Sequence, residues 1–182
     1  MRADARRNRA KVLEAAEEVF GTCGTSASTE DVAKRAGVGI GTVFRHFPTK
    51  EALLEELYMA RLRRLTEEAD ALADSVDPAA AFFGLFTRMV GESATKNAYV
   101  QALAEAGVDI RADASQTGHE LLRALGGLLA RAQAAGAVRP DVGVPELIAL
   151  LIGASQAAEH AGSDPVVRER TLAVVLDGLR HG

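Results

Sequence analysis

The side chains that could carry out catalysis or bind a metal are few and widely separated in this sequence. The four histidines stand at positions 46, 119, 160 and 181, and none has a Cys or a second His at metal-ligand spacing. There is no Gly-x-Ser-x-Gly motif and no glycine-rich phosphate loop after a strand. Glu159 and His160 are adjacent, so their side chains diverge on a helix. These patterns favour a binding protein without cofactor or metal over an enzyme.

The stretch from Ser28 to Phe47 indicates a different chemistry, the recognition of DNA. Ser28 and the acidic residues after it suit a helix N-terminus, and apolar residues then recur at helical spacing as far as position 36. Gly37 can end that helix in the left-handed conformation. A second helix from about 40 to 46 would bury Val43 and Phe47. Two short helices joined by a turn with a Gly form a helix-turn-helix, whose second helix enters the major groove.

The residues around the second helix support this interpretation. Gly39 and Gly41 each cost a helix up to about 1 kcal/mol relative to Ala, which makes sense if another backbone must come close. Pro48 then breaks the helix, and Thr49 followed by Glu51 can cap a new one. A long helix is therefore expected to begin where the DNA-reading element ends.

The run TEDVAKRAGVGIGTVFRHFPTKEAL, from Thr29 to Leu53, closely resembles the N-terminal domain of TetR-type transcriptional regulators. The residues in register with that motif are Ala33, Gly37, Val38, Gly41, Thr42, Phe44, Phe47, Pro48, Lys50, Glu51 and Leu53. The resemblance covers about the first fifty residues, and the rest of the chain is similar in length and helical character. It implies a DNA-binding domain, a larger helical body and a homodimer.

The resemblance also implies roles for individual residues on double-stranded DNA. Phosphate contacts are implied for Thr29, Thr42, His46 and Lys50. A base-facing surface is implied for Ile40, Gly41 and Phe44, and Arg45 lies near the same edge and could make either kind of contact. The family usually has Tyr where this chain has Phe44, so a phosphate-directed hydroxyl is replaced by an apolar ring. Because Glu30 also stands where some relatives have a base-reading basic residue, the operator sequence is not predicted.

The composition indicates an all-α protein with an uneven distribution of charge. Aromatic residues make up 4% of the 182 residues, there is no Trp, and no alternating β-branched run suggests a strand. The net charge is −4, yet residues 1–50 carry nine Lys or Arg against six Asp or Glu. A basic end on an acidic body fits a nucleic-acid contact confined to the N-terminus, with a solvated charged face as the alternative.

The cysteine content and hydropathy lead us to expect a soluble, cytoplasmic protein with no membrane partner. Cys23 is the single cysteine, and no secretory segment or long apolar span is present. We predict that Cys23, just past a helix end, is a buried small apolar residue. Before the first periodic segment, Arg2, Arg6, Arg7 and Arg9 predict a flexible arm that reaches phosphates or the minor groove, with a solubilising tail as the alternative.

About nine helices and two domains are predicted along the chain. The helices are expected near residues 10–20, 28–36, 40–46, 50–73, 78–92, 94–106, 114–135, 145–160 and 165–179. The first three should share a small core of Leu13, Ala16, Phe20, Val32, Ala33, Val43 and Phe47. Gly126 and Gly127, in the middle of a helix, indicate a kink or close approach by another helix. The predicted domains are residues 1–48, a helix-turn-helix domain with its basic arm, and residues 49–182, a ligand-binding and dimerisation domain.

A small-molecule effector of unknown identity could bind in the larger domain. Half of the eight aromatic residues fall between positions 82 and 99, and aromatic and Met side chains line ligand cavities as well as cores. The candidate pocket residues combine apolar walls with a few polar groups: Phe83, Phe86, Met89, Tyr99, His119, Gln156 and His160. Core packing or an interface is the alternative for each of them.

The last two helices are more apolar than one buried face requires. They could pack against their two-fold copies as a four-helix bundle, and small residues such as Gly153 and Ala157 would allow close contact. The candidate interface residues are Leu147, Leu150, Leu151, Ala154, Leu172, Val175, Leu176 and Leu179.

Taken together, the sequence predicts a homodimeric DNA-binding regulator, expected to be a repressor released from a near-palindromic operator by a small-molecule ligand. The alternative is a helical small-molecule carrier or enzyme whose N-terminal helices only resemble a DNA reader.

Overall fold

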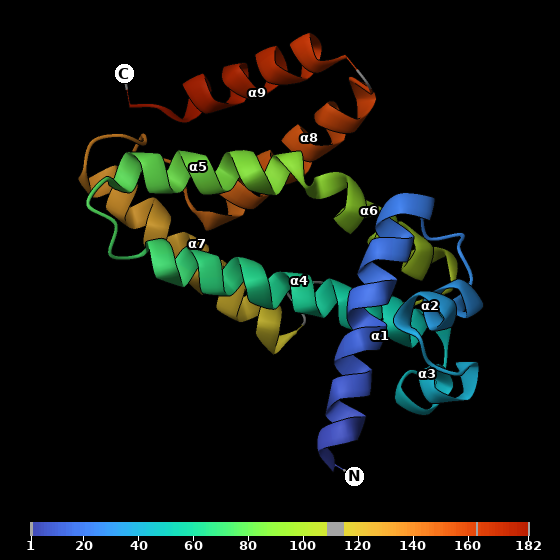
Figure 1. The fold of residues 1–182 in the computed structure, drawn as a ribbon. Helices are drawn as coiled ribbons and strands as arrows, with labels where there is room; N and C mark the ends of the chain where they lie inside the picture. The colour runs from blue at the N-terminus through green and yellow to red at the C-terminus, as the bar shows by residue number, and fades with distance from the viewer. Residues whose placement is uncertain (1, 109–114, 163, 182) are drawn as a thin grey trace. The chain divides into compact units, whose positions relative to one another are not determined.

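The computed structural model describes residues 2–108, 115–162 and 164–181. Within these ranges the chain is all-α, with nine helices and one isolated β-bridge between Val138 and Arg180 (Figure 1). The predicted fold class is confirmed. The helices are α1 (Arg2–Cys23), α2 (Thr29–Ala36), α3 (Ile40–His46), α4 (Lys50–Leu72), α5 (Pro78–Gly91), α6 (Ser93–Glu105), α7 (Gln116–Ala134), α8 (Val144–His160) and α9 (Pro165–Leu179). The predicted start of α7 at Ala114 lies outside the described residues.

The helices pack into two compact units that are interleaved along the sequence. The N-terminal unit comprises residues 1–61 and 95–111, and the C-terminal unit comprises residues 62–94 and 112–182. Helices α4 and α6 therefore each begin in one unit and end in the other. The predicted boundary at residues 48/49 divides the chain by proposed role, and it remains a prediction.

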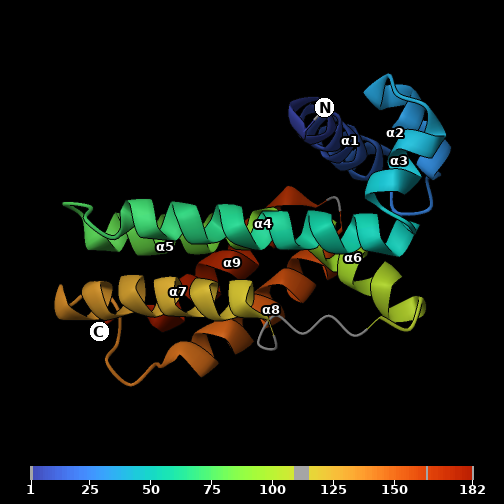
Figure 2. The ribbon, with the colours of Figure 1, turned by 90° about the horizontal axis from the view of Figure 1, so that it is seen from below.

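The core of the N-terminal unit joins α1, α2 and α3, which pack against one another (Figure 2). Ala16 and Phe20 of α1, Val32 and Ala33 of α2, Val43 of α3 and the following Phe47 are all buried, as predicted. Leu13 is half-buried, and Val12 takes the fully buried position beside it. One residue is about 100° of helical rotation, so the difference is a small error in helical phase.

The N-terminus differs from the predicted flexible arm because α1 extends back to Arg2. Alanine and arginine both have high helix propensity, and Arg7 pairs with Asp4 three residues earlier, which supports the first turns. At the other end of α1, Cys23 is exposed, so the predicted buried role is wrong. Cys23 is the last helical residue before Gly24, whose φ of 76° ends the helix, whereas Phe20 fills the core.

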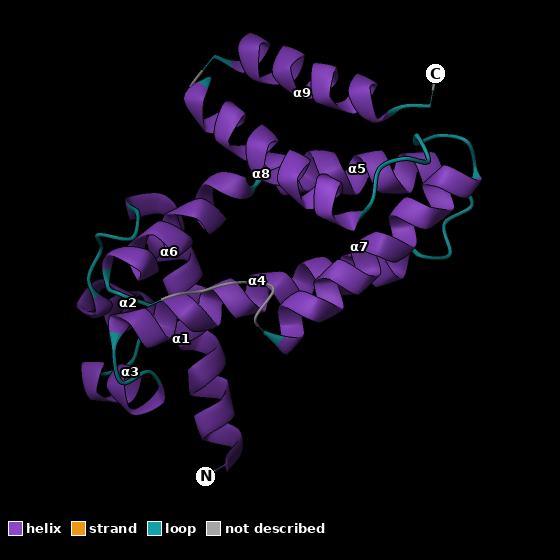
Figure 3. Ribbon diagram, turned by 180° about the vertical axis from the view of Figure 1, so that it is seen from behind, coloured by secondary structure: helices purple, strands orange, loops and turns teal. Residues whose placement is uncertain are grey.

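In the C-terminal unit, α5 packs against α7 and α8, and α9 packs along α8 (Figures 1 and 3). The predicted close approach in the middle of α7 is confirmed at Gly126. A Cβ at that position would lie 3.1 Å from Val144 Cγ2 at the start of α8. A Cβ on the neighbouring Gly127 would meet nothing within 4 Å.

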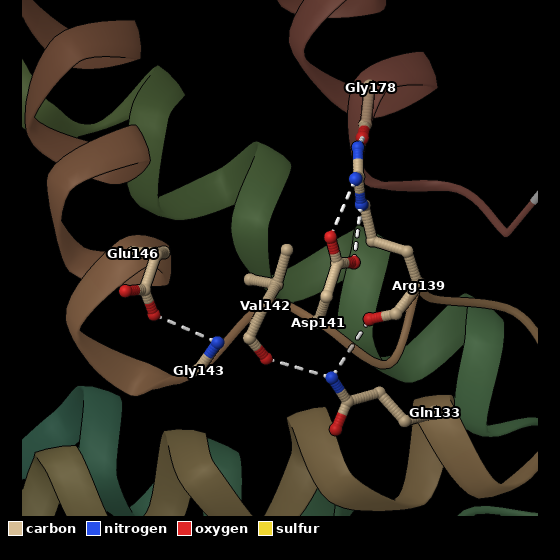
Figure 4. A network of polar contacts seen from close by, with 7 residues as sticks. All are labelled: Gln133, Arg139, Asp141, Val142, Gly143, Glu146 and Gly178. Atoms are coloured by element: carbon tan, nitrogen blue, oxygen red, sulfur yellow. Dashed lines mark hydrogen bonds and ion pairs between the residues drawn. The ribbon is translucent and has the colours of Figure 1, made fainter.

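The loop between α7 and α8 is held by a network of polar contacts (Figure 4). The side-chain amide of Gln133 donates to the carbonyls of Arg139, at 2.9 Å, and Val142, at 2.8 Å. The Arg139 guanidinium forms two bonds to the Asp141 carboxylate, at 2.6 and 2.7 Å, and lowers the pKa of that carboxyl below its ordinary value. The Arg139 backbone N–H donates to the Leu179 carbonyl at 3.0 Å. This loop therefore fixes the C-terminal end of α9.

Candidate nucleic-acid interface and ligand cavity

The first helix of the helix-turn-helix begins with a reciprocal cap. Ser28 Oγ accepts from the Asp31 N–H at 3.1 Å, and Asp31 Oδ2 accepts from the Ser28 N–H at 3.1 Å. The hydrogen bonds from Ser28 lower the pKa of the Asp31 carboxyl below its ordinary value. This capping box satisfies N–H groups that a helix N-terminus would otherwise leave without a partner. The next residue, the predicted phosphate contact Thr29, is largely buried.

The turn to the second helix has the geometry that the sequence predicts. Gly37 adopts φ 65° and ψ 34°, the left-handed conformation, and its N–H points to the carbonyls of Ala33 and Lys34. The Val38 N–H donates to the Ala33 carbonyl at 3.1 Å, which completes the C-terminal cap. Helix α3 then starts at Ile40, after Gly39 in an extended conformation. The short turn thus fixes the direction of α3 relative to α2.

Helix α3 has one buried side and one side that faces solvent. Val43 and the following Phe47 are buried, whereas the Phe44 side chain is 43% exposed. We define the recognition face as Ile40, Gly41, Phe44 and Arg45, which are exposed or half-buried. A Cβ at Gly39 or Gly41 would meet nothing within 4 Å. These glycines are therefore not required by packing within the chain.

The predicted phosphate contacts flank the recognition face, and some of their surroundings are structural. Thr42 and His46 of α3 are half-buried. Lys50 is the first residue of α4, which is capped by Thr49, whose Oγ1 accepts from the Ala52 N–H at 3.1 Å. The Lys50 ammonium lies 5.7 Å from the centroid of the Phe20 ring, a cation–π contact that holds the side chain on the three-helix core.

Arg9, which belonged to the predicted arm, instead ties α1 to α4. Its guanidinium lies 2.7 Å from the Glu56 carboxylate and 5.1 Å from the centroid of the Phe47 ring. Phe47 ends α3, so this contact supports the end of the recognition helix from behind. The sequence gave no clue to this role, because Arg9 and Glu56 are far apart along the chain.

The C-terminal unit contains a cavity between α5, α7 and α8. About 220 Å³ of space lies between its lining atoms, part of it open to solvent, and about 10 Å³ of this accepts the centre of a water-sized sphere. The lining side chains are all apolar: Phe82, Leu85, Phe86, Met89, Leu125, Leu128, Leu147 and Leu151. Seven of these eight residues are buried and Met89 is half-buried.

The structure brings two of the predicted pocket residues, Phe86 and Met89, to this cavity. Phe83 lies beside it, with its ring centroid 5.2 Å from that of Phe82 and 4.6 Å from the Arg180 guanidinium carbon. Tyr99 is buried in the N-terminal unit. The three polar candidates lie on exposed positions of α7 and α8, away from the lining: His119, Gln156 and His160. The lining leucines of α7 and α8 were missed, although they belong to the apolar stripes of those helices.

The predicted interface residues divide into two groups. Leu147, Leu151, Ala154 and Leu179 are buried within the chain, and the first two line the cavity. Leu150 is exposed, and Leu172, Val175 and Leu176 are half-buried. The same two helices also expose Ile152, Val166, Val167 and Val174. An apolar surface therefore remains on α8 and α9 after the chain has folded.

A capped helix-turn-helix joined to a larger helical body is the architecture of a bacterial one-chain transcription regulator. Residues 12–57 match the family described as bacterial regulatory proteins, tetR family, and residues 77–181 match the SbtR-like transcriptional regulator C-terminal domain. The chain belongs to the TetR family of transcription regulators, which bind DNA and are not enzymes.

Solved structures similar to the chain extend over its whole length. A TetR transcription regulatory protein from Mycobacterium vanbaalenii is 41% identical, with 98% of each chain covered and a TM-score of 0.76. The regulator SCO0520 from Streptomyces coelicolor is 34% identical over 95% of this chain and 98% of its own, with a TM-score of 0.71. The uncharacterized HTH-type regulator YhgD of Bacillus subtilis is 38% identical over 72 residues, so the chain spans 36% of that protein's length.

Two other kinds of site were searched for in the described part of the chain. No group of three or more His, Cys, Asp or Glu side chains there could hold a metal ion. No helix there is long and apolar enough to cross a membrane.

Proposed function

We propose that this protein is a homodimeric repressor that binds a near-palindromic operator and is released by a small-molecule ligand. The observation that carries the proposal is the recognition face of α3, which is exposed on a firmly capped helix-turn-helix and has no neighbour within the chain. An α-helix presented in this way fits the major groove of B-DNA.

The contacts divide into two kinds. Ile40, Gly41 and Phe44 face the bases, and Gly41 lets the DNA come close because it carries no side chain. Thr42, His46 and Lys50 bind phosphates at the rim, and Arg45 supports either contact. Thr29 is largely buried, so its backbone N–H at the start of α2 is the group that serves this role. An apolar recognition face suits thymine methyl groups, and phosphate contacts supply much of the affinity.

The exposed apolar residues of α8 and α9 form the dimer interface in this proposal. Leu150 and Ile152 on α8 and Val166 and Val174 on α9 remain exposed on the folded chain, which favours burial against a second copy. The dimer then carries two recognition helices, whose separation is about 34–36 Å or a multiple of it on the operator.

Ligand release uses the cavity and α4. The cavity lies in the C-terminal unit, and α4 runs without interruption from Lys50, at the DNA-binding end, to Leu72 in that unit. A ligand that favours a different arrangement of the C-terminal unit can act on the recognition helices through this continuous helix. Linkage requires that DNA then weakens ligand binding by the same factor as the ligand weakens DNA binding. Such a protein acts in the cytoplasm.

Selection of bound genomic fragments by the purified protein tests the proposal. We expect enrichment of a near-palindromic sequence, bound by fluorescence anisotropy with a Kd that rises steeply with salt. Binding without sequence preference at moderate salt would contradict the assignment of a specific operator. An operator affinity that no candidate ligand changes would leave a regulator that is not inducible.

A further inference from the structure

The cavity between α5, α7 and α8 restricts the chemistry of its occupant. All eight lining side chains are apolar, and no polar atom contributes to its surface. A carboxylate, phosphate or ammonium group placed there would lose its hydration without gaining a partner, which costs several kcal/mol. The polar side chains that could have recognised such a group, His119, Gln156 and His160, lie on exposed positions instead.

Water is also a poor occupant of this cavity. The space that accepts a water-sized sphere, about 10 Å³, is close to the minimum for one molecule, and a buried water needs two to four polar partners. The lining supplies none. Dry apolar cavities lined by Leu, Ile and Phe are known to accept benzene or xenon.

Met89 is the side chain through which the cavity can open. The other seven lining residues are buried, and Met89 is half-buried, so it forms the boundary between the cavity and the solvent. Its unbranched side chain has three rotatable bonds and changes shape at little cost. A compact guest can therefore enlarge the space by displacing Met89, without breaking a hydrogen bond.

We propose that this cavity binds an uncharged, compact apolar molecule about the size of a single aromatic ring, and that the guest enters past Met89. Calling this guest the effector rests on the proposed function, whereas its binding to the cavity does not. The rings of Phe82 and Phe86, with centroids 6.5 Å apart, provide the aromatic part of the wall. The leucines of α7 and α8 provide the aliphatic part.

Thermal unfolding of the full chain without DNA, in benzene and separately in benzoate, tests the chemistry of the site. Benzene at about ten times its Kd should raise Tm by roughly 3–6 °C. Benzoate has the same ring and a charge, and it should bind at least about 100-fold more weakly. Equal binding of the two, or no binding of benzene, would overturn the proposal.

Two variants and one crystallographic measurement locate the site. Leu128→Phe fills the cavity and should abolish the benzene shift, whereas Met89→Ala should tighten benzene binding several-fold and admit two-ring hydrocarbons. If Leu128→Phe does not fold, a wild-type crystal under xenon pressure should show xenon in contact with Leu125 and Leu147. Xenon bound elsewhere, or a folded Leu128→Phe that binds benzene unchanged, would contradict the location.

The outcomes separate this inference from the proposed function. Benzene binding without any effect on operator affinity would support the cavity site and count against ligand release. Selective operator binding by a protein that takes up neither benzene nor xenon would support the DNA-binding role and reject the cavity site.

Discussion

Phe44 shows how one side chain determines what the recognition face can do. Its ring is nearly half exposed on a helix whose opposite side is anchored by Val43, so its identity has little effect on folding. A phenyl ring cannot donate a hydrogen bond to phosphate, and its natural partner in the major groove is a thymine methyl group. Sequence preference should therefore depend on Phe44, and general affinity on the cationic rim.

Phe44→Ala and Lys50→Ala should separate these two roles. Phe44→Ala should change the preferred operator and leave the salt dependence of the Kd unaltered, because it removes a base contact. Lys50→Ala should weaken binding to all sequences and reduce the slope of log Kd against log salt by about 1. Fluorescence anisotropy on matched and scrambled operators measures both.

Thermal unfolding is the control for this pair, because Lys50 also packs on the Phe20 ring. Phe44→Ala should stay within about 0.5 kcal/mol of the wild type in stability. Equal loss of affinity on every sequence from both variants would refute the division of roles.

Helix α7 contains two adjacent glycines with different surroundings. A Cβ at Gly127 meets open space, so Gly127→Ala should raise the free energy of unfolding by up to about 1 kcal/mol through helix propensity. Gly126→Ala gains the same propensity but forces Val144 at the start of α8 to move by a few tenths of an ångström. Its gain should therefore be smaller or negative. Urea denaturation of both variants checks this, and equal gains would show that α7 and α8 do not constrain each other here.

The α7–α8 loop should make stability depend on pH through Asp141. Arg139 lowers the pKa of Asp141 in the folded protein, so the pair stabilises the fold at neutral pH. That contribution is lost as pH falls below the ordinary Asp value and through the lowered one. Asp141→Asn should therefore unfold at a lower temperature than the wild type at pH 7, and the difference should shrink in acid. A difference that stays constant down to pH 3 would exclude this ion pair as the cause.

At the level of elements, local signals were predictable and long-range ones were not. Ser28, Gly37 and Thr49 are caps, and a cap is specified by a few neighbouring residues. The cavity is assembled from three helices far apart in the sequence. Its location depends on the rotation of each helix, and a shift of one position, as between Leu13 and Val12, moves a residue about 100° around the helix. The N-terminal arginines were also misread, because charge alone does not distinguish an arm from a helix.

The whole molecule should depend on the apolar surface of α8 and α9 for its assembly. Ile152 is 49% exposed and Val174 is 72% exposed, and placing Asp at either should disrupt a dimer by burying an unpaired charge. Each variant should have the mass of a monomer in analytical ultracentrifugation and bind the full operator much more weakly. Val76→Asp is the matched control, since Val76 lies fully exposed in the α4–α5 loop and should leave the mass unchanged. Dimers that persist in both interface variants would place the contact elsewhere.

The interleaving of the two units has a consequence for how the chain can be divided. Thr95–Glu105 of α6, with its buried Tyr99 and Leu103, belongs to the same unit as the DNA-binding helices, although more than thirty residues of the other unit separate them in the sequence. No single cut yields either unit whole. The two halves of this regulator must therefore be inherited, expressed and folded together, and a swap of domains with a relative would have to exchange α6 along with the reader.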